Sequence, residues 1–236
     1  MCPAPGLGGL NGALDSPDLF SMKSLILLSG GVDSAACAAF YSRLGHSVRG
    51  LFVDYGQPVR SVERESAAKV AAHYSIPLQS VVCQGPEANF SGEISGRNAF
   101  LITTAMVFNP KWTGIIALGI HAGTEYYDCG HTFVEDISRV VEGYSDGRVA
   151  LGVPFLNWTK KMIWDFCLAN HVPVEITWSC EVGPKTPCGK CLSCRELEAI
   201  YARQTDLPPF SVPIIMRVLG LFLAFVLLRG ATRREP

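Results

Sequence analysis

The feature of this chain that most constrains its fold is a regular alternation of short apolar runs with longer helical patterns. The five runs are rich in Val, Ile and Leu and occupy residues 24–28, 48–53, 78–83, 114–118 and 149–153. Strands that are apolar on both faces are typical of a parallel sheet covered by helices. The alternation therefore predicts an α/β fold with its ligand site at the carboxyl ends of the strands.

The segments that follow these runs have the spacing of amphipathic helices. They occupy approximately residues 33–44, 59–74, 97–108, 132–143 and 160–170. With 236 residues, of which 48% are hydrophobic and 17% charged, the chain can bury a full core. We expect residues 22–178 to form one α/β domain with helices on both faces of its sheet.

Net charge and the composition of the N-terminal residues limit the classes of protein that this chain can belong to. The formal net charge is −1 and the pI is near 6.5, so the composition gives no basic surplus for a polyanion, and we expect no nucleic-acid partner. Residues 1–21 have three prolines and four glycines but neither the basic start nor the apolar run of a signal peptide. We expect a disordered extension there and a cytoplasmic protein.

The C-terminal residues 211–236 contain an apolar run, residues 218–228, with Arg217 before it and Arg229 after it. A membrane-spanning helix needs about 20 apolar residues, so the run of eleven is too short to predict a span. A packed or oligomer-facing helix is favoured. A membrane anchor and a tail foreign to the fold, such as out-of-frame coding sequence, stay as alternatives.

A glycine turn joins the first apolar run to the first helical pattern. It reads Ser29-Gly30-Gly31-Val32-Asp33-Ser34. A loop in this position directs unpaired N–H groups at an anion, and its glycines permit close approach of the backbone. An ordinary strand-to-helix turn with Asp33 as a cap is the alternative. The complete string after an apolar strand favours nucleotide binding.

This string resembles the PP-loop of the ATP pyrophosphatases, which cleave ATP between its α and β phosphates and adenylate a substrate. The resemblance implies the Rossmann-like fold of the adenine nucleotide alpha hydrolases. It also implies that Asp33 acts through Mg²⁺, because a carboxylate beside a triphosphate needs a cation between them. The lysine of the common P-loop is absent from the turn, as expected where the γ-phosphate is not transferred.

Four cysteines near the end of the predicted domain have the spacing C-x7-C-x2-C-x2-C. They are Cys180, Cys188, Cys191 and Cys194. Four thiolates suit a closed tetrahedral zinc site, and a closed site has no position for a reactive water. We therefore predict a small lobe, residues 179–210, with structural zinc. An iron–sulfur cluster and a set of unliganded thiols are the alternatives.

The glycine turn and the cysteine cluster together resemble the 7-cyano-7-deazaguanine synthase (QueC) family. Coverage extends from Met22 to Arg195. The further matching positions are Asp54-Tyr55-Gly56-Gln57 with Glu63 or Glu65 downstream, Gly96-Arg97-Asn98 with Phe100-Leu101, Tyr126 with Asp128-Cys129, and Pro154 with Lys160.

This resemblance implies an ATP-dependent ligase that converts 7-carboxy-7-deazaguanine and ammonia to the nitrile through an adenylate and an amide. ATP, Mg²⁺ and structural zinc are the implied cofactors, and a homodimer is the implied assembly. The implied catalytic residues are Asp33, Lys160 and Arg97. The implied nucleotide-binding residues are Ser29, Gly30, Gly31, Val32, Asp33, Ser34, Asp54, Tyr55 and Gln57. The implied acceptor-binding residues are Arg97, Asn98, Tyr126 and Asp128.

Departures from the family pattern fall where the acceptor is expected. The family reads G-Y-P-D-C-R where this chain reads E-Y-Y-D-C-G at residues 125–130, and Leu197 replaces an arginine. A PP-loop enzyme that joins a deazaguanine-like carboxylate to another acceptor is therefore the alternative. A tRNA thiolase and a non-enzymatic zinc module are disfavoured by charge and by the intact turn. For His121, just after a strand end, a structural role is favoured.

Overall fold

The structure is a computed structural model that describes residues 22–204 except 84, 86–93, 122, 124–125 and 184. The predictions for residues 1–21, for the end of the lobe from residue 205 and for the tail of residues 211–236 lie outside these described residues. Within the described part of the chain, no helix combines the length and apolar character needed to cross a membrane.

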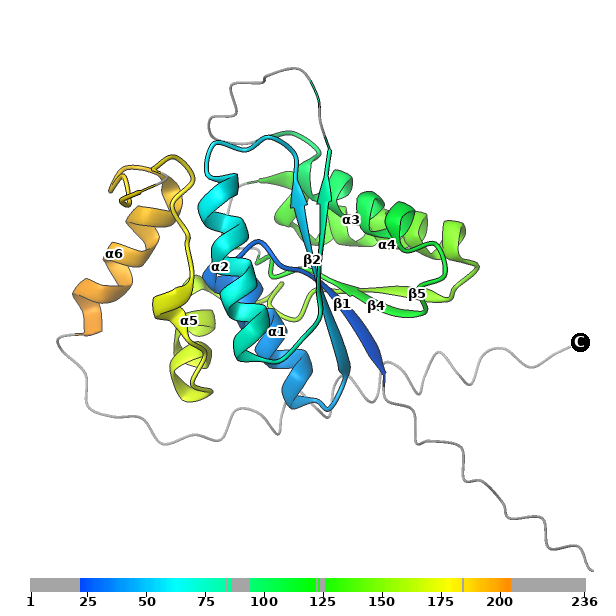
Figure 1. The fold of residues 1–236 in the computed structure, drawn as a ribbon, viewed down its shortest axis with the longest axis horizontal. Coiled ribbons are helices and arrows are strands. Elements are labelled where there is room, and N and C mark those ends of the chain that lie inside the picture. The colour runs from blue at the N-terminus through cyan, green and yellow to red at the C-terminus, as the bar shows by residue number, and fades with distance from the viewer. Residues whose placement is uncertain are drawn as a thin grey trace, which may run out of the picture.

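Five parallel strands form one sheet, as the apolar runs predict (Figure 1). They are β1 (Lys23–Leu27), β2 (Ser47–Asp54), β3 (Leu78–Val82), β4 (Gly114–Ala117) and β5 (Val149–Gly152). Their order in the sheet is β3-β2-β1-β4-β5, and every neighbouring pair is parallel. The predicted α/β class is confirmed, and each strand end lies within one residue of its expected position.

Helices cover both faces of this sheet. They are α1 (Val32–Arg43), α2 (Arg60–His73), α3 (Arg97–Phe108), α4 (His131–Ser145), α5 (Lys160–Ala169) and α6 (Leu192–Gln204), with short 3-10 turns at Tyr127–Cys129 and Val174–Ile176. Figure 1 shows α1, α2 and α5 on one side of the sheet and α3 and α4 on the other. The first five helices match the predicted patterns, whereas α6 has no counterpart among them.

The strands bury both of their faces, which explains their uniformly apolar sequences. In β1 and the residue after it, Ile26 and Leu28 join the hydrophobic cluster that contains α1, α2 and α5. Leu25 and Leu27 join the cluster that contains α3 and α4. Alternate side chains of a strand point to opposite faces, so each strand contributes to two cores at once.

The last described helix shares the core of the α/β domain. Ile200 in α6 is buried within the cluster of α1 and α5, and the rings of Trp164 and Tyr201 lie 5.1 Å apart. The division between residues 22–178 and a lobe of residues 179–210 stays a prediction. The packing of α6 nevertheless ties the cysteine segment to α5.

The order of the strands creates a crevice above β1 and β4. The chain passes from β1 to β2 on one side, whereas β4 adds on the other side, and ligands bind at such a switch point in open α/β sheets. Gly119, just after β4, allows close contact here, because a Cβ at this position would lie 2.4 Å from the carbonyl oxygen of Asp33. The beginning of α1 is thereby held against the end of β4.

Candidate functional site

A cavity of about 270 Å³ lies at this carboxyl edge of the sheet. Twelve of the residues singled out in the sequence line it: Ser29, Gly31, Val32, Asp33, Ser34, Tyr55, Gln57, Arg97, Asn98, Tyr126, Asp128 and Lys160. The fold thus brings together residues from segments far apart in the chain. Gly30 and Asp54 are not part of the lining.

Gly30 instead allows the glycine turn to lie directly against α2. Its φ is +86°, and a Cβ would meet the Glu63 carbonyl oxygen at 2.6 Å and the Ala67 nitrogen at 2.7 Å. A larger residue would therefore be strained and would also displace α2. The carbonyl oxygen of Gly30 accepts a 2.9 Å hydrogen bond from the N–H of Trp178. This bond joins the turn to the segment before the cysteines.

Asp33 and Lys160 form an ion pair in the cavity. Asp33 lies in the first turn of α1 and Lys160 begins α5, and the lysine Nζ is 2.5 Å from Asp33 Oδ2. The Lys160 side chain is only 12% exposed. The other carboxylate oxygen, Oδ1, is buried and has no hydrogen-bond partner in the described part of the chain. A buried oxygen without a partner among the described residues, beside the glycine turn, fits a cation ligand.

Asn98 and Asp128 contact each other at the opposite side of the cavity. The Asn98 backbone N–H donates to Asp128 Oδ2 at 3.1 Å, and Asn98 Nδ2 donates to the Asp128 carbonyl oxygen at 2.9 Å. Both residues are buried. They join the start of α3 to the 3-10 turn of residues 127–129, so they shape the wall. Their contact with an acceptor stays a prediction.

Asp54 is occupied by neighbouring protein groups. Its carboxylate pairs with Arg64 from α2 and accepts a 3.1 Å hydrogen bond from the N–H of Gly56. These contacts hold the end of β2 and the turn after it. The structure therefore places Asp54 behind the wall of the cavity, and its predicted contact with the nucleotide has no geometric support.

Glu63, in the first turn of α2, lines the cavity together with the glycine turn and Arg97. Gln57 Nε2 donates to Glu63 Oε2 at 2.9 Å, while Gln57 Oε1 accepts from the Tyr55 N–H at 2.9 Å. Burial raises the pKa of Glu63, and the Gln57 hydrogen bond and the charge of Arg97 oppose this rise only in part. The site thus contains a carboxylate with an elevated pKa that is held in place.

His121 lines the same cavity and is buried. Its Nδ1 accepts a hydrogen bond from the N–H of Gly123 at 3.2 Å, so the neutral ring has its proton on Nε2. Burial lowers the pKa of His121, which keeps the ring neutral at pH 7. The structural role that the sequence favours for His121 explains only the Nδ1 hydrogen bond. Nε2 has no hydrogen bond with any described residue. His121 is therefore a neutral donor in the wall.

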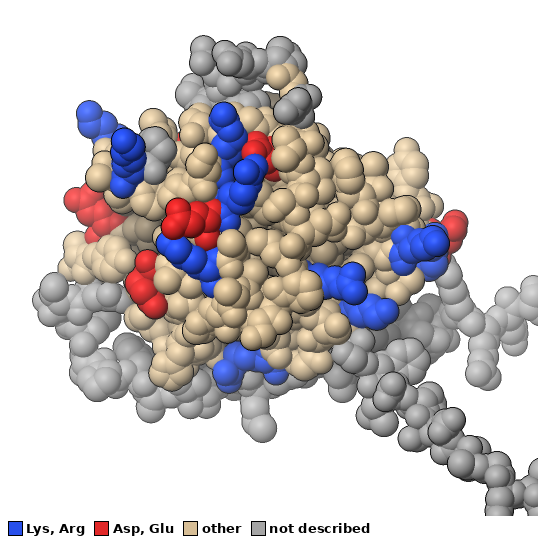
Figure 2. Space-filling model, in the orientation of Figure 1, with Lys and Arg blue, Asp and Glu red and all other residues tan. Residues whose placement is uncertain are grey.

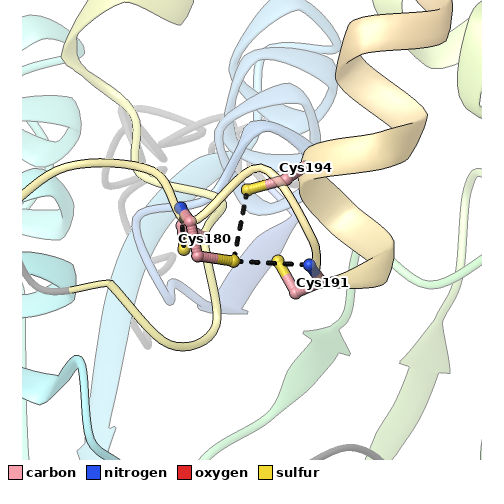
Figure 3. A group of neighbouring side chains, drawn as sticks. Cys180, Cys191 and Cys194 are labelled. Carbon is pink, nitrogen blue, oxygen red and sulfur yellow. Dashed lines mark hydrogen bonds between the residues drawn. The ribbon is translucent and has the colours of Figure 1, made fainter.

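The four predicted cysteines form a compact group. Their sulfur atoms all lie within 4.8 Å of one another, and Cys188 Sγ is 4.0 Å from Cys194 Sγ. Figure 3 shows Cys180, Cys191 and Cys194 converging from the loop and from the start of α6. The cluster can hold a metal ion, as the spacing predicts.

Backbone N–H groups surround these sulfur atoms. Cys180 Sγ accepts from the N–H of Gly183 at 3.1 Å and from that of Cys188 at 3.3 Å. The N–H groups of Lys190 and Cys191 lower the pKa of Cys188 to about 6. Donation to sulfur stabilises the thiolate form, which is the form that binds metal.

The segment around the cysteines also forms part of the cavity wall, which the sequence patterns do not predict. The residues concerned are Trp178, Ser179, Glu181, Leu192, Ser193 and Glu196. Ser193 Oγ donates to Glu181 Oε1 at 2.8 Å, and Trp178 Nε1 donates to the Cys180 carbonyl oxygen at 3.0 Å. A metal in the cluster would thus hold the wall as well as the lobe.

Surface charge is mixed on the face drawn in Figure 2. Lysine and arginine side chains are spread over it, and several lie beside acidic side chains. Within α2, Lys69 Nζ lies 2.7 Å from Glu65 Oε1, and within α5, Lys161 Nζ lies 2.6 Å from Asp165 Oδ2. Among the described residues on this face, positive charge is divided into small patches.

Comparison with known proteins places these features in a family. A model described as "Queuosine biosynthesis protein QueC" matches residues 23–90 and 86–204. The 7-cyano-7-deazaguanine synthase of Prochlorococcus marinus (strain NATL2A) is 31% identical over 202 residues, which cover 73% of this chain and 89% of that protein. The synthase of Synechococcus sp. (strain RCC307) is 30% identical over 208 residues, or 76% and 94%.

Among solved structures, NMN synthetase from Francisella tularensis is similar to this chain. The match has 15% sequence identity and a TM-score of 0.48, and it covers 92% of this chain and 87% of that chain.

Proposed function

The chain belongs to the QueC family, and from this premise we propose that it is an ATP-dependent carbon–nitrogen ligase that makes 7-cyano-7-deazaguanine from 7-carboxy-7-deazaguanine and ammonia. The observation that carries the proposal is a single cavity with two chemically different sides. Asp33, Lys160 and the glycine turn are on one side, and Arg97 and the Asn98–Asp128 pair are on the other. ATP and an acid can therefore meet there.

On the nucleotide side, the N–H groups of the glycine turn and the start of α1 would bind the phosphates. Asp33 would hold Mg²⁺ through the buried Oδ1, which has no partner among the described residues, and the ion, when bound, would neutralise phosphate charge. Lys160 already contacts Asp33 and would stabilise charge that develops at the α-phosphate. His121 would donate a hydrogen bond from Nε2. These groups would act mainly through positioning and electrostatics.

On the acceptor side, the guanidinium of Arg97 would bind the carboxylate of the substrate and direct one oxygen at the α-phosphate. Attack releases pyrophosphate and forms the acyl adenylate, whose AMP group ammonia can displace to give the amide. The amide oxygen is then adenylated in the same way, and loss of AMP with the remaining N–H protons gives the nitrile. Asp128 and Tyr126 would orient the deazaguanine ring by hydrogen bonding and stacking.

For the cysteine cluster we propose one structural Zn²⁺. With a zinc–sulfur distance of about 2.3 Å, tetrahedral geometry places sulfur atoms roughly 3.8 Å apart. The 4.0 Å between Cys188 and Cys194 suits this spacing, whereas a cluster of several irons needs a wider group of thiolates. Elemental analysis is expected to give about one zinc per chain. Iron with visible absorbance would contradict the assignment.

We also propose that the protein works in the cytoplasm as a homodimer. None of the eight cysteines in the described residues forms a disulfide, which suits a reducing compartment. Val107 and Phe108 on α3 and Tyr144 on α4 are large and exposed, which suits burial against a second copy. Light scattering of the purified chain would give its mass in solution.

The second candidate is an enzyme that joins the deazaguanine-like carboxylate to an acceptor other than ammonia, and residues 126–130 favour it. Tyr127 replaces the proline of the family pattern, is 60% exposed and donates its hydroxyl to Asp136 at 3.2 Å. Gly130 replaces the arginine of that pattern. Loss of a guanidinium beside Asp128 would remove a contact available to the usual acceptor.

Product analysis distinguishes the two candidates. The purified chain is incubated with ATP, Mg²⁺, ammonium and 7-carboxy-7-deazaguanine, and products are identified by mass spectrometry. The proposal expects AMP, pyrophosphate and 7-cyano-7-deazaguanine. Adenylation of the acid without amide or nitrile, together with AMP release when an amine other than ammonia is added, would favour the second candidate.

A further inference from the structure

The reaction proposed above needs a base that its nucleotide-binding groups do not supply. The nitrogen enters as ammonia and ends as a nitrile, so all of its protons must leave it. One leaves when ammonia displaces the first AMP, and two leave as the amide loses its oxygen with the second AMP. A carboxylate or neutral imidazole within reach of that nitrogen would accelerate each step.

The contacts of the acidic and imidazole groups that line the cavity separate them into two sets. Asp33 is paired with Lys160, and Asp128 accepts the Asn98 N–H. The Nδ1 lone pair of His121 accepts a hydrogen bond from the N–H of Gly123, so the ring can only donate, from Nε2. Glu181 accepts from Ser193 and directly follows the cluster cysteine Cys180. Each of these groups therefore has a contact or a proposed role elsewhere, which leaves Glu63 and Glu196 among the described lining residues.

Glu63 is the better placed of these two. Its backbone lies against Gly30 of the nucleotide turn, and Arg97, which would hold the reacting carboxylate, exerts its charge on Glu63. Glu63 is therefore adjacent to the glycine turn and within electrostatic reach of Arg97. Gln57 fixes Oε2 by a 2.9 Å hydrogen bond, and no described residue hydrogen-bonds to Oε1. Glu196, on α6, instead acts electrostatically on His121.

We infer that Glu63 is the catalytic residue that accepts protons from the substrate nitrogen, in both the amidation and the dehydration steps. In each step the lone pair of Oε1 takes a proton from nitrogen. In the dehydration, the N–H bonding electrons go to the C–N bond as the C–O bond breaks and AMP leaves with the oxygen. In the amidation, these electrons remain on nitrogen as the amide forms. The proton passes from Glu63 to solvent before the next step. This inference rests on the proposed function.

The surroundings of Glu63 raise the pH range in which it exchanges protons. Burial raises its pKa, and the charges of Asp54 and Glu181 raise it further, while Gln57 and Arg97 lower it. The remaining neighbour, Tyr55, is neutral at pH 7, since burial raises its pKa as well. Because the base must be deprotonated, the rate falls as pH decreases through the raised pKa of Glu63. The acid limb is thus expected above the usual range of a carboxylate.

The test uses the full-length Glu63→Gln variant, because its amide oxygen can still accept the Gln57 hydrogen bond. Adenylation is measured as ATP–pyrophosphate exchange dependent on 7-carboxy-7-deazaguanine without ammonium. Amide and nitrile formation are measured with ammonium. We expect exchange within threefold of wild type and amide and nitrile formation about 10²–10⁴-fold slower, with the acid limb lost. Glu63→Asp is expected to keep that limb at a lower rate.

Glu65→Gln is the matched control, because Glu65 lies on the same helix with its side chain 65% exposed. It should leave both assays unchanged. Nitrile formation by Glu63→Gln within threefold of wild type would overturn the inference, as would equal loss of exchange and nitrile formation, which would place Glu63 in adenylation. Loss in Glu196→Gln alone would assign the base to α6. Absence of exchange in wild type would instead contradict the proposed function.

Discussion

The nucleotide side of the cavity is built mainly from the six consecutive residues 29–34, whereas the acceptor side combines residues from α2, α3, the 3-10 turn of residues 127–129 and the cysteine segment. In the first region, sequence neighbours form most of the site, and Lys160 and His121 come from distant segments. In the second, each side chain depends on the packing of a different element. The first region can therefore be recognised from a short contiguous sequence, whereas the second can be recognised only from the three-dimensional structure.

The two regions also differ in how their polar groups are satisfied. Asp33 has one buried oxygen with no hydrogen-bond partner among the described residues, which leaves that oxygen available to a ligand. On the acceptor side, Asn98 and Asp128 satisfy each other. Substitutions on the nucleotide side are therefore expected to reduce the reaction rate with little loss of stability. Substitutions on the acceptor side are expected to reduce both the reaction rate and the stability.

The largest effect is expected from Asp33→Asn. The amide keeps the size of the side chain but loses the charge that would hold Mg²⁺, so AMP formation should fall on the order of 10³-fold. Zinc content should not change. Asp165→Asn serves as the control, because Asp165 is half exposed and pairs only with Lys161 on the surface of α5. AMP formation by Asp33→Asn close to the wild-type rate would exclude the cation role.

A smaller loss is expected from Lys160→Met, which removes the charge beside Asp33 but keeps an extended side chain. We expect AMP formation to fall about 10²-fold, the cost of one electrostatic contact to the transition state. Lys161→Met provides a neighbouring comparison, since Lys161 is 46% exposed and points to Asp165. Its rate should stay within twofold of wild type. Equal losses in the two variants would show a general charge effect.

The smallest effect on chemistry is expected from Asn98→Ala, which should instead show the structural character of the acceptor side. Loss of Nδ2 leaves the Asp128 carbonyl oxygen without its 2.9 Å hydrogen bond, at a cost of about 1–3 kcal/mol in the free energy of unfolding. The KM for the acid should rise while that for ATP stays constant. Denaturant unfolding and exchange kinetics measure the two quantities. A raised KM for ATP would contradict the division into two sides.

The same division explains what the sequence could predict. Parallel strands buried on both faces leave an apolar signature, so the elements from β1 to α5 are predictable to within about two residues of their ends. The glycine turn and the cysteine spacing are local as well. By contrast, α6 carries mixed residues such as Ser193, Arg195 and Glu196, and its packed apolar residues Leu197, Ile200 and Tyr201 span little more than one turn. So short a periodic pattern does not by itself indicate a helix.

Three features of the site depend on pairs of residues that only packing brings together. His121 is recognisable as a donor once Gly123 is seen to occupy Nδ1. Asp54 belongs to a motif next to the nucleotide turn, yet its partner Arg64 takes its carboxylate. Glu181 and Glu196 reach the cavity because the cysteine cluster lies beside it. Their position next to the metal-binding cysteines is the only sequence signal that could have indicated a role.

The central claim, that one cavity adenylates both oxygens of the same carboxyl group in turn, can be tested with acid labelled by ¹⁸O in both carboxylate oxygens. Each adenylation transfers one of these oxygens to AMP. The account predicts two AMP molecules per nitrile, each with one ¹⁸O, and no label in pyrophosphate or water. A single labelled AMP per acid consumed, with the second oxygen retained in an amide product, would contradict it.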